Sequence, residues 1–210
     1  MNTIHIAASR EYDVLIGHGL LDELGALAAG VVDAKTAAIV SDDSVFALYG
    51  KRAAAALERV GFRVVSFVFP HGESSKNLTV YGKVLNFLCE NRVSRTDVVV
   101  ALGGGVVGDL AGFAAATYLR GLRFVQVPTT LLSMVDSSVG GKTAVDLPEG
   151  KNLAGAFHQP ALVLCDIAAL DTLPEETFRE GCAEVIKTAI LFDRPLFDRL
   201  AQDGLNFDRE

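Results

Sequence analysis

The sequence predicts an α/β fold in which a parallel sheet is covered by helices on both faces. Two observations predict it: short apolar runs typical of buried strands alternate with segments of helical periodicity, and polar residues cluster just after the apolar runs. A third is the change of pattern near residue 172, after which the chain reads as helical with no further strand. We therefore expect an α/β domain over residues 1–171 and the beginning of a helical domain over residues 172–210.

Bulk composition narrows the class of protein and of partner. Hydrophobic residues make up 50% of the chain and charged residues 21%, which indicates a folded globular protein. A net charge of −7 and a pI near 5.1 argue against nucleic acid or an anionic membrane as the main partner. No secretory signal, membrane-length apolar stretch or paired cysteine spacing is evident, so we expect a cytoplasmic protein with reduced thiols.

Each expected element has a local reason. The first two apolar runs, residues 3–8 and 12–17, read as a short strand pair around a polar turn. The helix over residues 77–92 follows from apolar side chains at helical spacing, and Pro70 stops the strand before it. The remaining expected strands are residues 37–45, which end in polar residues, and residues 62–69, 97–102, 124–128 and 161–166. The remaining expected helices are an alanine-rich one up to Gly61, one through Tyr118, and two over residues 173–193 and 194–201.

A glycine turn follows one of these strands and opens a helix. Gly103, Gly105 and Gly108 match the G-x-G-x-x-G spacing, which lets backbone amides and a helix N-terminus face a pyrophosphate. The usual acidic residue about 20 positions on is missing, so the sheet is Rossmann-like without being the ordinary first βαβ unit. The pair Asp42–Asp43 could hold a ribose instead. The alternative is a tight strand-to-helix turn that binds no ligand.

The segment "DSSVGGKT", residues 136–143, comes within one residue of a P-loop. Asp136 stands where the P-loop needs its first glycine, and a carboxylate there repels phosphate. The segment also does not follow a strand directly. We therefore expect Lys142 to serve something other than a nucleoside triphosphate.

Polar residues concentrate where the predicted strands end. Because the carboxyl ends of parallel strands meet at one edge, these residues can converge on one cleft. They are Glu73, Lys76, Asp109, Thr129, Thr130, Asp136, Lys142, Lys151 and Asn152. Plainer interpretations stay open for several of them: Glu73 and Lys76 as a surface pair, Thr129 as a helix N-cap, and Lys151 as a solvated loop lysine.

On the predicted last long helix, Glu184 and Lys187 lie one turn apart within an apolar run. They form either an exposed intrahelical pair or part of a functional site in which Glu184 is a metal ligand. One carboxylate is not a metal site, and the four histidines show no ligand spacing.

Three long motifs resemble the 3-dehydroquinate synthase family: "GGGVVGDLAGFAAATYLRGLRFVQVPTTLLSMVDSSVGGKTAV", "EGKNLAGAFHQP" and "GCAEVIKTAI". The resemblance spans essentially the whole chain. It implies an NAD-binding α/β domain followed by the start of a truncated helical metal-binding domain, with the active site between them. It further implies a homodimer that acts on the seven-carbon keto-acid sugar phosphate DAHP.

The resemblance also implies roles for individual residues. Lys142 and Lys151 would lie where cofactor and substrate meet, and Arg120 would reach the substrate phosphate from the partner subunit. Glu184 would be one ligand to Zn²⁺ or Co²⁺, whose two histidine ligands are absent from this chain. NAD would contact Asp42, Glu73, Lys76, Gly104, Gly105, Val106, Asp109, Thr129, Thr130 and Thr172, and the substrate would contact Asp136, Asn152 and Lys187.

In such an enzyme NAD transiently oxidises the substrate, phosphate is eliminated, the hydride returns, and an internal aldol addition closes the ring. The chain alone is expected to be inactive. Two alternatives from other classes remain: an NAD-linked, metal-dependent polyol dehydrogenase of the glycerol dehydrogenase type, and a stand-alone NAD-binding module. A dehydrogenase would accumulate NADH with a simple polyol, whereas a cyclase would not.

Overall fold

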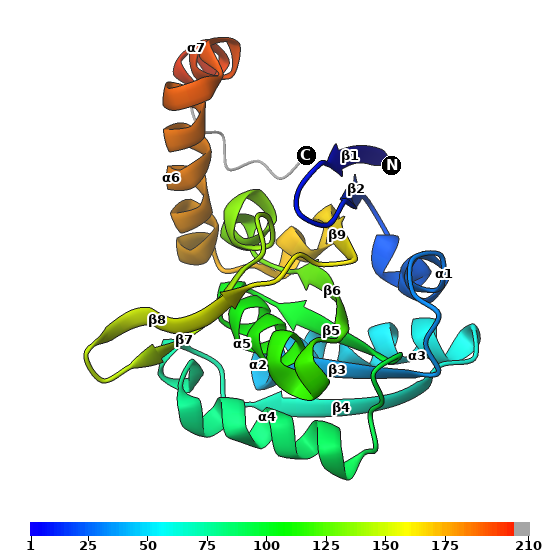
Figure 1. The fold of residues 1–210 in the computed structure, drawn as a ribbon. Coiled ribbons are helices and arrows are strands. Elements are labelled where there is room, and N and C mark those ends of the chain that lie inside the picture. The colour runs from blue at the N-terminus through cyan, green and yellow to red at the C-terminus, as the bar shows by residue number, and fades with distance from the viewer. Residues whose placement is uncertain (204–210) are drawn as a thin grey trace.

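A seven-stranded sheet forms the centre of the fold, in the order β1-β2-β9-β6-β5-β3-β4 (Figure 1). The computed structural model describes residues 1–203. All neighbouring strands are parallel except the first pair, in which β1 runs antiparallel to β2. The strands are β1 (Asn2–Ile6), β2 (Tyr12–Gly17), β3 (Thr36–Asp42), β4 (Arg63–Phe69), β5 (Val98–Gly103), β6 (Arg123–Pro128) and β9 (Leu162–Asp166).

The strand order reverses between β3 and β5. The chain moves outward from β3 to β4, then crosses back to place β5 on the other side of β3 and continues to β6. The two connections leave β3 and β5 in opposite directions, which opens a crevice beyond their carboxyl ends. Ligands of open α/β sheets bind at such a switch point.

Helices cover both faces of the sheet, as the sequence predicted. The helices are η1 (Leu20–Glu23), α1 (Leu24–Ala29), α2 (Asp43–Val45), η2 (Phe46–Gly50), α3 (Lys51–Arg59), η3 (Glu73–Ser75), α4 (Leu78–Glu90), α5 (Gly105–Thr117), η4 (Tyr118–Arg120), η5 (Ser133–Ser137), η6 (Ile167–Thr172), α6 (Glu175–Phe192) and α7 (Arg194–Asp203). α1 and α3 pack on one face, and α4 and α5 pack on the other.

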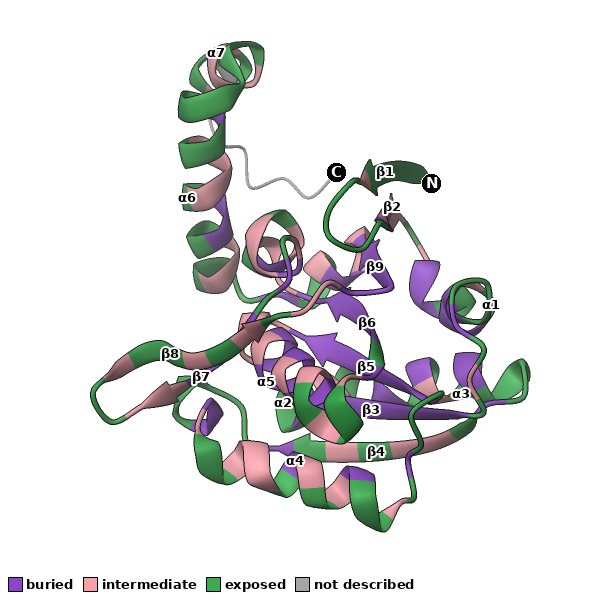
Figure 2. Ribbon diagram, in the orientation of Figure 1, coloured by how far each residue is buried: buried purple, intermediate pink, exposed green. Residues whose placement is uncertain are grey.

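Strand β5 shows why its sequence is a continuous apolar run. Val100 and Leu102 belong to the core beneath α1 and α3, whereas Val99 and Ala101 belong to the core beneath α4 and α5. Successive side chains of a strand point to opposite faces, so a strand covered on both sides must be apolar throughout. The buried colouring in Figure 2 accordingly follows the central strands.

A two-stranded hairpin, β7 (Lys142–Leu147) and β8 (Gly150–Phe157), was not predicted. β8 is rich in glycine and alanine, and neither strand shows the apolar–polar alternation that marks a half-buried strand. Close approach of the two strands depends on Gly155, because a Cβ there would lie 2.1 Å from the Thr143 carbonyl oxygen. The hairpin extends away from the sheet (Figure 1).

The predicted helices after residue 172 are confirmed as α6 and α7. α6 projects from the sheet (Figure 1), and its lower part packs closely where a Cβ on Gly181 would lie 2.6 Å from the Cβ of Leu131. Its last turn exposes Ile190, Leu191 and Phe192. The domain boundary at residue 172 stays a prediction, and residues 204–210 of the second predicted domain lie outside the described residues. Within residues 1–203, no helix is long and apolar enough to cross a membrane.

Candidate functional site

A cavity of about 740 Å³ lies at the carboxyl ends of β3 and β5, where the strand order reverses. We call it the switch-point cavity. The residues that the resemblance assigned to NAD alone all line it: Asp42, Glu73, Lys76, Gly104, Gly105, Val106, Asp109, Thr129, Thr130 and Thr172. The structure therefore brings them together, and their contact with NAD stays a prediction.

The glycines of the turn have two different roles: some permit close packing, and others line the cavity. A Cβ on Gly103 would lie 2.5 Å from Val107, and one on Gly108 would lie 2.7 Å from the Gln126 side chain, so both permit α5 to pack tightly. Gly104 and Gly105 line the cavity instead. Gly104 is the N-cap of α5 and offers no side-chain cap, so the first backbone N–H groups of this helix are available to an anion.

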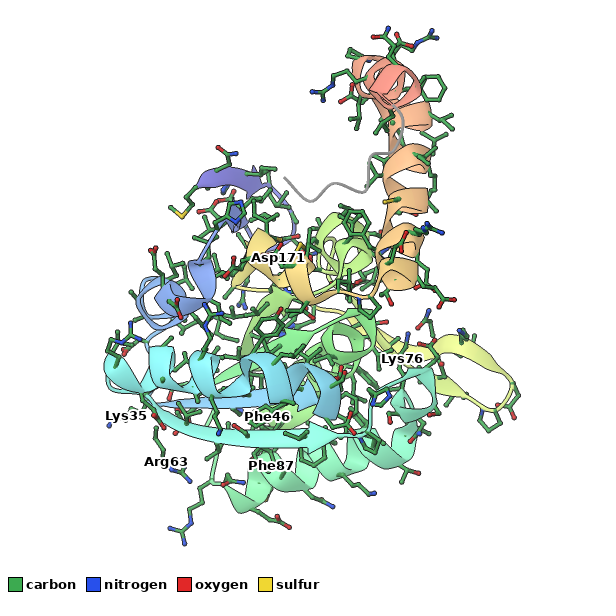
Figure 3. All side chains as sticks on the ribbon, turned by 180° about the vertical axis from the view of Figure 1, so that it is seen from behind. Lys35, Phe46, Arg63, Lys76, Phe87 and Asp171 are labelled. Carbon is green, nitrogen blue, oxygen red and sulfur yellow. The ribbon has the colours of Figure 1, made fainter. Side chains whose placement is uncertain are left out.

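Lys76 and Asp109 form a buried ion pair in the wall of this cavity. The Lys76 ammonium donates to Asp109 Oδ2 over 2.7 Å, and the two side chains are only 6% and 17% exposed. Burial raises the pKa of Asp109 above its ordinary value, and the nearby Lys76 charge offsets part of that rise. The interpretation of Glu73 and Lys76 as a surface pair is therefore wrong. Figure 3 shows Lys76 near the base of the β7–β8 hairpin.

Thr129 supplies a hydroxyl without a protein partner. The residue is 5% exposed, lines the cavity, and its Oγ1 makes no hydrogen bond. It is not an N-cap; the neighbouring Thr130 accepts the Ser133 N–H instead, over 3.1 Å. Because an unsatisfied buried polar group costs free energy, this hydroxyl is suited to contact a ligand.

The two aspartates at the end of β3 have different surroundings. Asp42 lines the cavity and caps α2, because its Oδ1 accepts the Val45 N–H over 2.8 Å. Asp43 does not line the cavity and binds His71, whose Nδ1 lies 2.7 Å from Asp43 Oδ1. Of the pair that the sequence suggested for a ribose, the structure therefore leaves Asp42 as the candidate.

Tyr49 and His71 also line the cavity and were missed by sequence reasoning. The Tyr49 hydroxyl donates to the Ala169 carbonyl over 3.2 Å and contacts the hydroxyl of Thr172. It thereby fixes Thr172 against η2. Tyr49 lies in a π-helical turn, a local widening that is frequent at functional sites but leaves no signature in the residue pattern.

A second cavity of about 500 Å³, the hairpin cavity, adjoins the first. Asp136, Lys142 and Asn152 line it, as three of the predicted substrate and catalytic residues. Lys142 Nζ lies 3.2 Å from Asp136 Oδ1, and both side chains are well exposed. Asp109 and Asp136 line both cavities, so the two share a wall.

Lys151 lines neither cavity but reaches the rim of the first. Its ammonium lies 3.0 Å from Glu73 Oε1, and this hydrogen-bonded carboxylate raises the pKa of Lys151. The residue belongs to β8 and is not a loop lysine. It thus connects the hairpin to the segment that carries Glu73 and Lys76.

Three further predicted site residues, besides Lys151, lie outside both cavities. Glu184 and Lys187 form the intrahelical pair of the plainer interpretation, with 2.8 Å between Lys187 Nζ and Glu184 Oε1. Glu184 raises the pKa of Lys187, and Asp136 adds to the rise. Arg120 is exposed in a turn where Leu119 and Arg120 have φ of 51° and 67°. Within residues 1–203, no group of three histidine, cysteine, aspartate or glutamate side chains could hold a metal ion.

Comparison with known proteins gives the family. The family model described as 3-dehydroquinate synthase N-terminal matches residues 66–180. The chain belongs to the 3-dehydroquinate synthase family. It is 50% identical over 194 residues to the 3-dehydroquinate synthase of Nostoc sp. strain PCC 7120, a match that covers 92% of this chain and 53% of the relative. The chain thus spans about half the length of the curated relatives that it matches.

Two solved structures are similar to this chain over most of its length. A 2-epi-5-epi-valiolone synthase from Streptomyces hygroscopicus subsp. jinggangensis, solved with NAD⁺ and Zn²⁺ bound, has a TM-score of 0.83 at 36% identity, covering 95% of this chain and 55% of that one. A probable glycerol dehydrogenase from Sinorhizobium meliloti has a TM-score of 0.67 at 21% identity, covering 84% and 45%. The second likeness shows the fold alone.

Proposed function

We propose that this chain is the NAD-binding part of a 3-dehydroquinate synthase, the lyase that converts DAHP into 3-dehydroquinate and phosphate in the shikimate pathway. One observation supports the proposal in addition to family membership. The switch-point cavity and the hairpin cavity share Asp109 and Asp136, so a cofactor in the first and a substrate in the second would be neighbours. That arrangement suits a reaction in which the cofactor reversibly oxidises a bound substrate.

The residues of the switch-point cavity fit a dinucleotide. Its volume lies within the ~300–1,000 Å³ typical of ligand pockets. The uncapped start of α5 suits a pyrophosphate, Asp42 suits a ribose hydroxyl, and the unpartnered Thr129 hydroxyl suits a further polar contact. When bound, NAD would supply a reversible hydride acceptor.

The residues of the hairpin cavity fit a substrate that carries a carboxylate and a phosphate. Lys142 places a cation at the cavity wall, Asp136 can accept from substrate hydroxyls, and Asn152 can both donate and accept. Lys187 on α6 is within the electrostatic influence of Asp136. These groups would hold and orient the substrate, which is the main contribution that a protein makes to such a sequence of steps.

The proposal includes a divalent metal, a homodimer and a cytoplasmic location. The described residues do not by themselves build a metal site, so Glu184 is proposed as one ligand to Zn²⁺ or Co²⁺ and no step is derived through the metal. Arg120, exposed at the surface, would contact the substrate phosphate in the partner subunit. Residues 1–171 would form the NAD domain and residues 172–210 the start of the metal domain.

An assay of DAHP turnover tests the proposal. The purified chain should form no dehydroquinate from DAHP with NAD and Zn²⁺, and should gain activity when the C-terminal half of the Nostoc relative is added as a separate polypeptide. Lys142→Met should abolish the restored activity. NADH that accumulates with glycerol in the restored mixture would contradict the cyclase assignment and favour a polyol dehydrogenase. Dehydroquinate formation by the chain alone would contradict the need for the second half.

A further inference from the structure

Asp146 on β7 contacts residues of both cavities. It belongs to none of the sequence motifs and has no role in the proposed function. Its Oδ1 accepts the backbone N–H of Asn152 over 2.8 Å, and its own N–H donates to the Lys76 carbonyl over 2.9 Å. The same Oδ1 lies 4.0 Å from Lys76 Nζ. Asp146 therefore links a residue of the hairpin cavity, through its side chain, to a residue of the switch-point cavity, through its backbone N–H and its charge.

The pairing of the hairpin is interrupted at Asp146. β7 and β8 pair regularly from Lys142 opposite Phe157 to Val145 opposite Ala154, and pairing resumes at Leu147 opposite Gly150. One residue of β7, Asp146, thus faces the unpaired residues 151–153 of β8. Such irregularities re-aim side chains next to functional sites.

The interrupted segment carries two of the predicted site residues, Lys151 and Asn152. Asn152 adopts φ of 59°, a left-handed conformation that is uncommon for residues other than glycine. The hydrogen bond from the Asn152 N–H to Asp146 stabilises this conformation directly. Without it, the backbone of β8 could relax and both side chains would change direction.

The charge of Asp146 acts on the same neighbours. Its side chain is 19% exposed, so its field is only partly screened by water. It places a second carboxylate near the buried Lys76 ammonium, in addition to that of Asp109. Glu73 is the main cause of the raised pKa of Lys151, and the charge of Asp146 adds to the rise. Asp146 therefore influences by charge the residues that it also holds by hydrogen bonds.

We propose that Asp146 is a positioning residue that holds the irregular segment of β8, and so presents Lys151 and Asn152 beside Lys76. The functional meaning of this position rests on the proposed function, in which Lys151 and Asn152 serve cofactor and substrate. The positioning itself does not, because it is a property of the folded hairpin.

Backbone amide hydrogen exchange at Asn152, measured by NMR on the full chain, tests the inference. Asp146→Ala should accelerate exchange of the Asn152 amide by about tenfold or more, because the acceptor is lost. Asp146→Asn should keep the amide protected, since its carbonyl oxygen can still accept, while lowering the pKa of Lys151. The matched control is Glu149→Ala, which removes an exposed carboxylate from the same hairpin and should change neither quantity.

A double variant covers the case in which Asp146→Ala disrupts the hairpin. Adding Asn152→Gly should restore the melting temperature, because glycine adopts the left-handed conformation without strain. An Asn152 amide that stays protected in a folded Asp146→Ala chain, or no restoration by Asn152→Gly, would overturn the proposal. Titration of the same samples with NAD separates the two claims: absence of binding to the wild-type chain would count against the proposed function, and the exchange result would still decide the role of Asp146.

Discussion

The two adjoining cavities are built in different ways. The switch-point cavity stands on the ends of fully buried strands and contains a buried ion pair, Lys76–Asp109, and a hydroxyl without a partner, Thr129. The hairpin cavity stands on a two-stranded ribbon outside the sheet, and its pair Lys142–Asp136 is exposed. Figure 2 shows a similar contrast between the buried central strands and β8, which is mostly exposed.

This difference teaches which part of the site is fixed by folding. Side chains on the central strands are held by packing, so the switch-point cavity exists before any ligand binds. Exposed ion pairs contribute little and exchange partners readily, so Lys142 and Asp136 can turn toward a charged substrate at small cost. Under the proposed function, the sheet would therefore provide preformed cofactor binding and the hairpin would provide adaptable substrate binding.

The largest expected effect concerns the sheet. Leu102→Ala removes a fully buried side chain of β5 and should lower the free energy of unfolding by about 2–5 kcal/mol. Leu153→Ala on β8, where the side chain is 59% exposed, should change it by no more than about 0.5 kcal/mol. Urea denaturation of both variants measures the free energy of unfolding. Equal decreases in the two variants would contradict the claim that the sheet is held by packing and the hairpin is not.

The ion pairs should give the next largest effect. Lys76→Met leaves Asp109 buried without its partner and should cost about 2 kcal/mol at pH 7, less than a fully buried pair because Asp109 keeps some exposure. Lys142→Met removes an exposed partner and should cost less than about 1 kcal/mol.

The pH dependence of the Lys76→Met variant sharpens this comparison. Burial already raises the pKa of Asp109, and loss of the Lys76 charge raises it further. A carboxyl whose pKa is higher in the folded state than in the unfolded state destabilises the fold when it is ionised. The stability that Lys76→Met loses relative to wild type should therefore decrease as the pH falls and Asp109 becomes protonated. Urea unfolding at pH 7 and pH 5 checks the sign, and a deficit that grows on acidification would contradict it.

A smaller effect is expected where the hairpin joins the sheet. His158 Nε2 lies 2.7 Å from the Leu122 carbonyl, to which it can donate, and the ring stacks on Phe124. Burial lowers the pKa of His158 below its usual 6.5, so its neutral form stabilises the fold above that pH, and this stability is lost as the pH falls below it. His158→Gln should cost about 1 kcal/mol at pH 7.5 and weaken the loss of stability between pH 6.5 and 5. An unchanged pH profile would contradict this assignment.

The sequence predicted the sheet well because a strand covered on both faces needs a continuous apolar run. β5 is apolar throughout, and β3 and β9 are apolar over residues 37–40 and 162–165. The sequence also predicted that the polar residues after these strands lie at one edge of the sheet, because the carboxyl ends of parallel strands meet there. The hairpin could not be predicted in this way. Its stability depends on Gly155 and on the interruption at Asp146, which are properties of strand approach and register.

The sequence motifs include most of the polar residues that line the two cavities, but they do not include Tyr49, His71 or Asp146. These residues belong to no phosphate-binding or catalytic pattern. They act through contacts between segments far apart in the chain, such as that of the Tyr49 hydroxyl with Ala169. Only the fold makes such contacts visible.

Calorimetric titration of NAD into the purified chain tests the central claim most directly. We expect saturable binding by the wild-type chain. Thr129→Val should weaken it by about tenfold without loss of stability, because the hydroxyl that it removes has no partner within the protein. A folded wild-type chain that gives no heat of binding, or a Thr129→Val variant that binds as tightly as wild type, would contradict the assignment of the switch-point cavity to the cofactor.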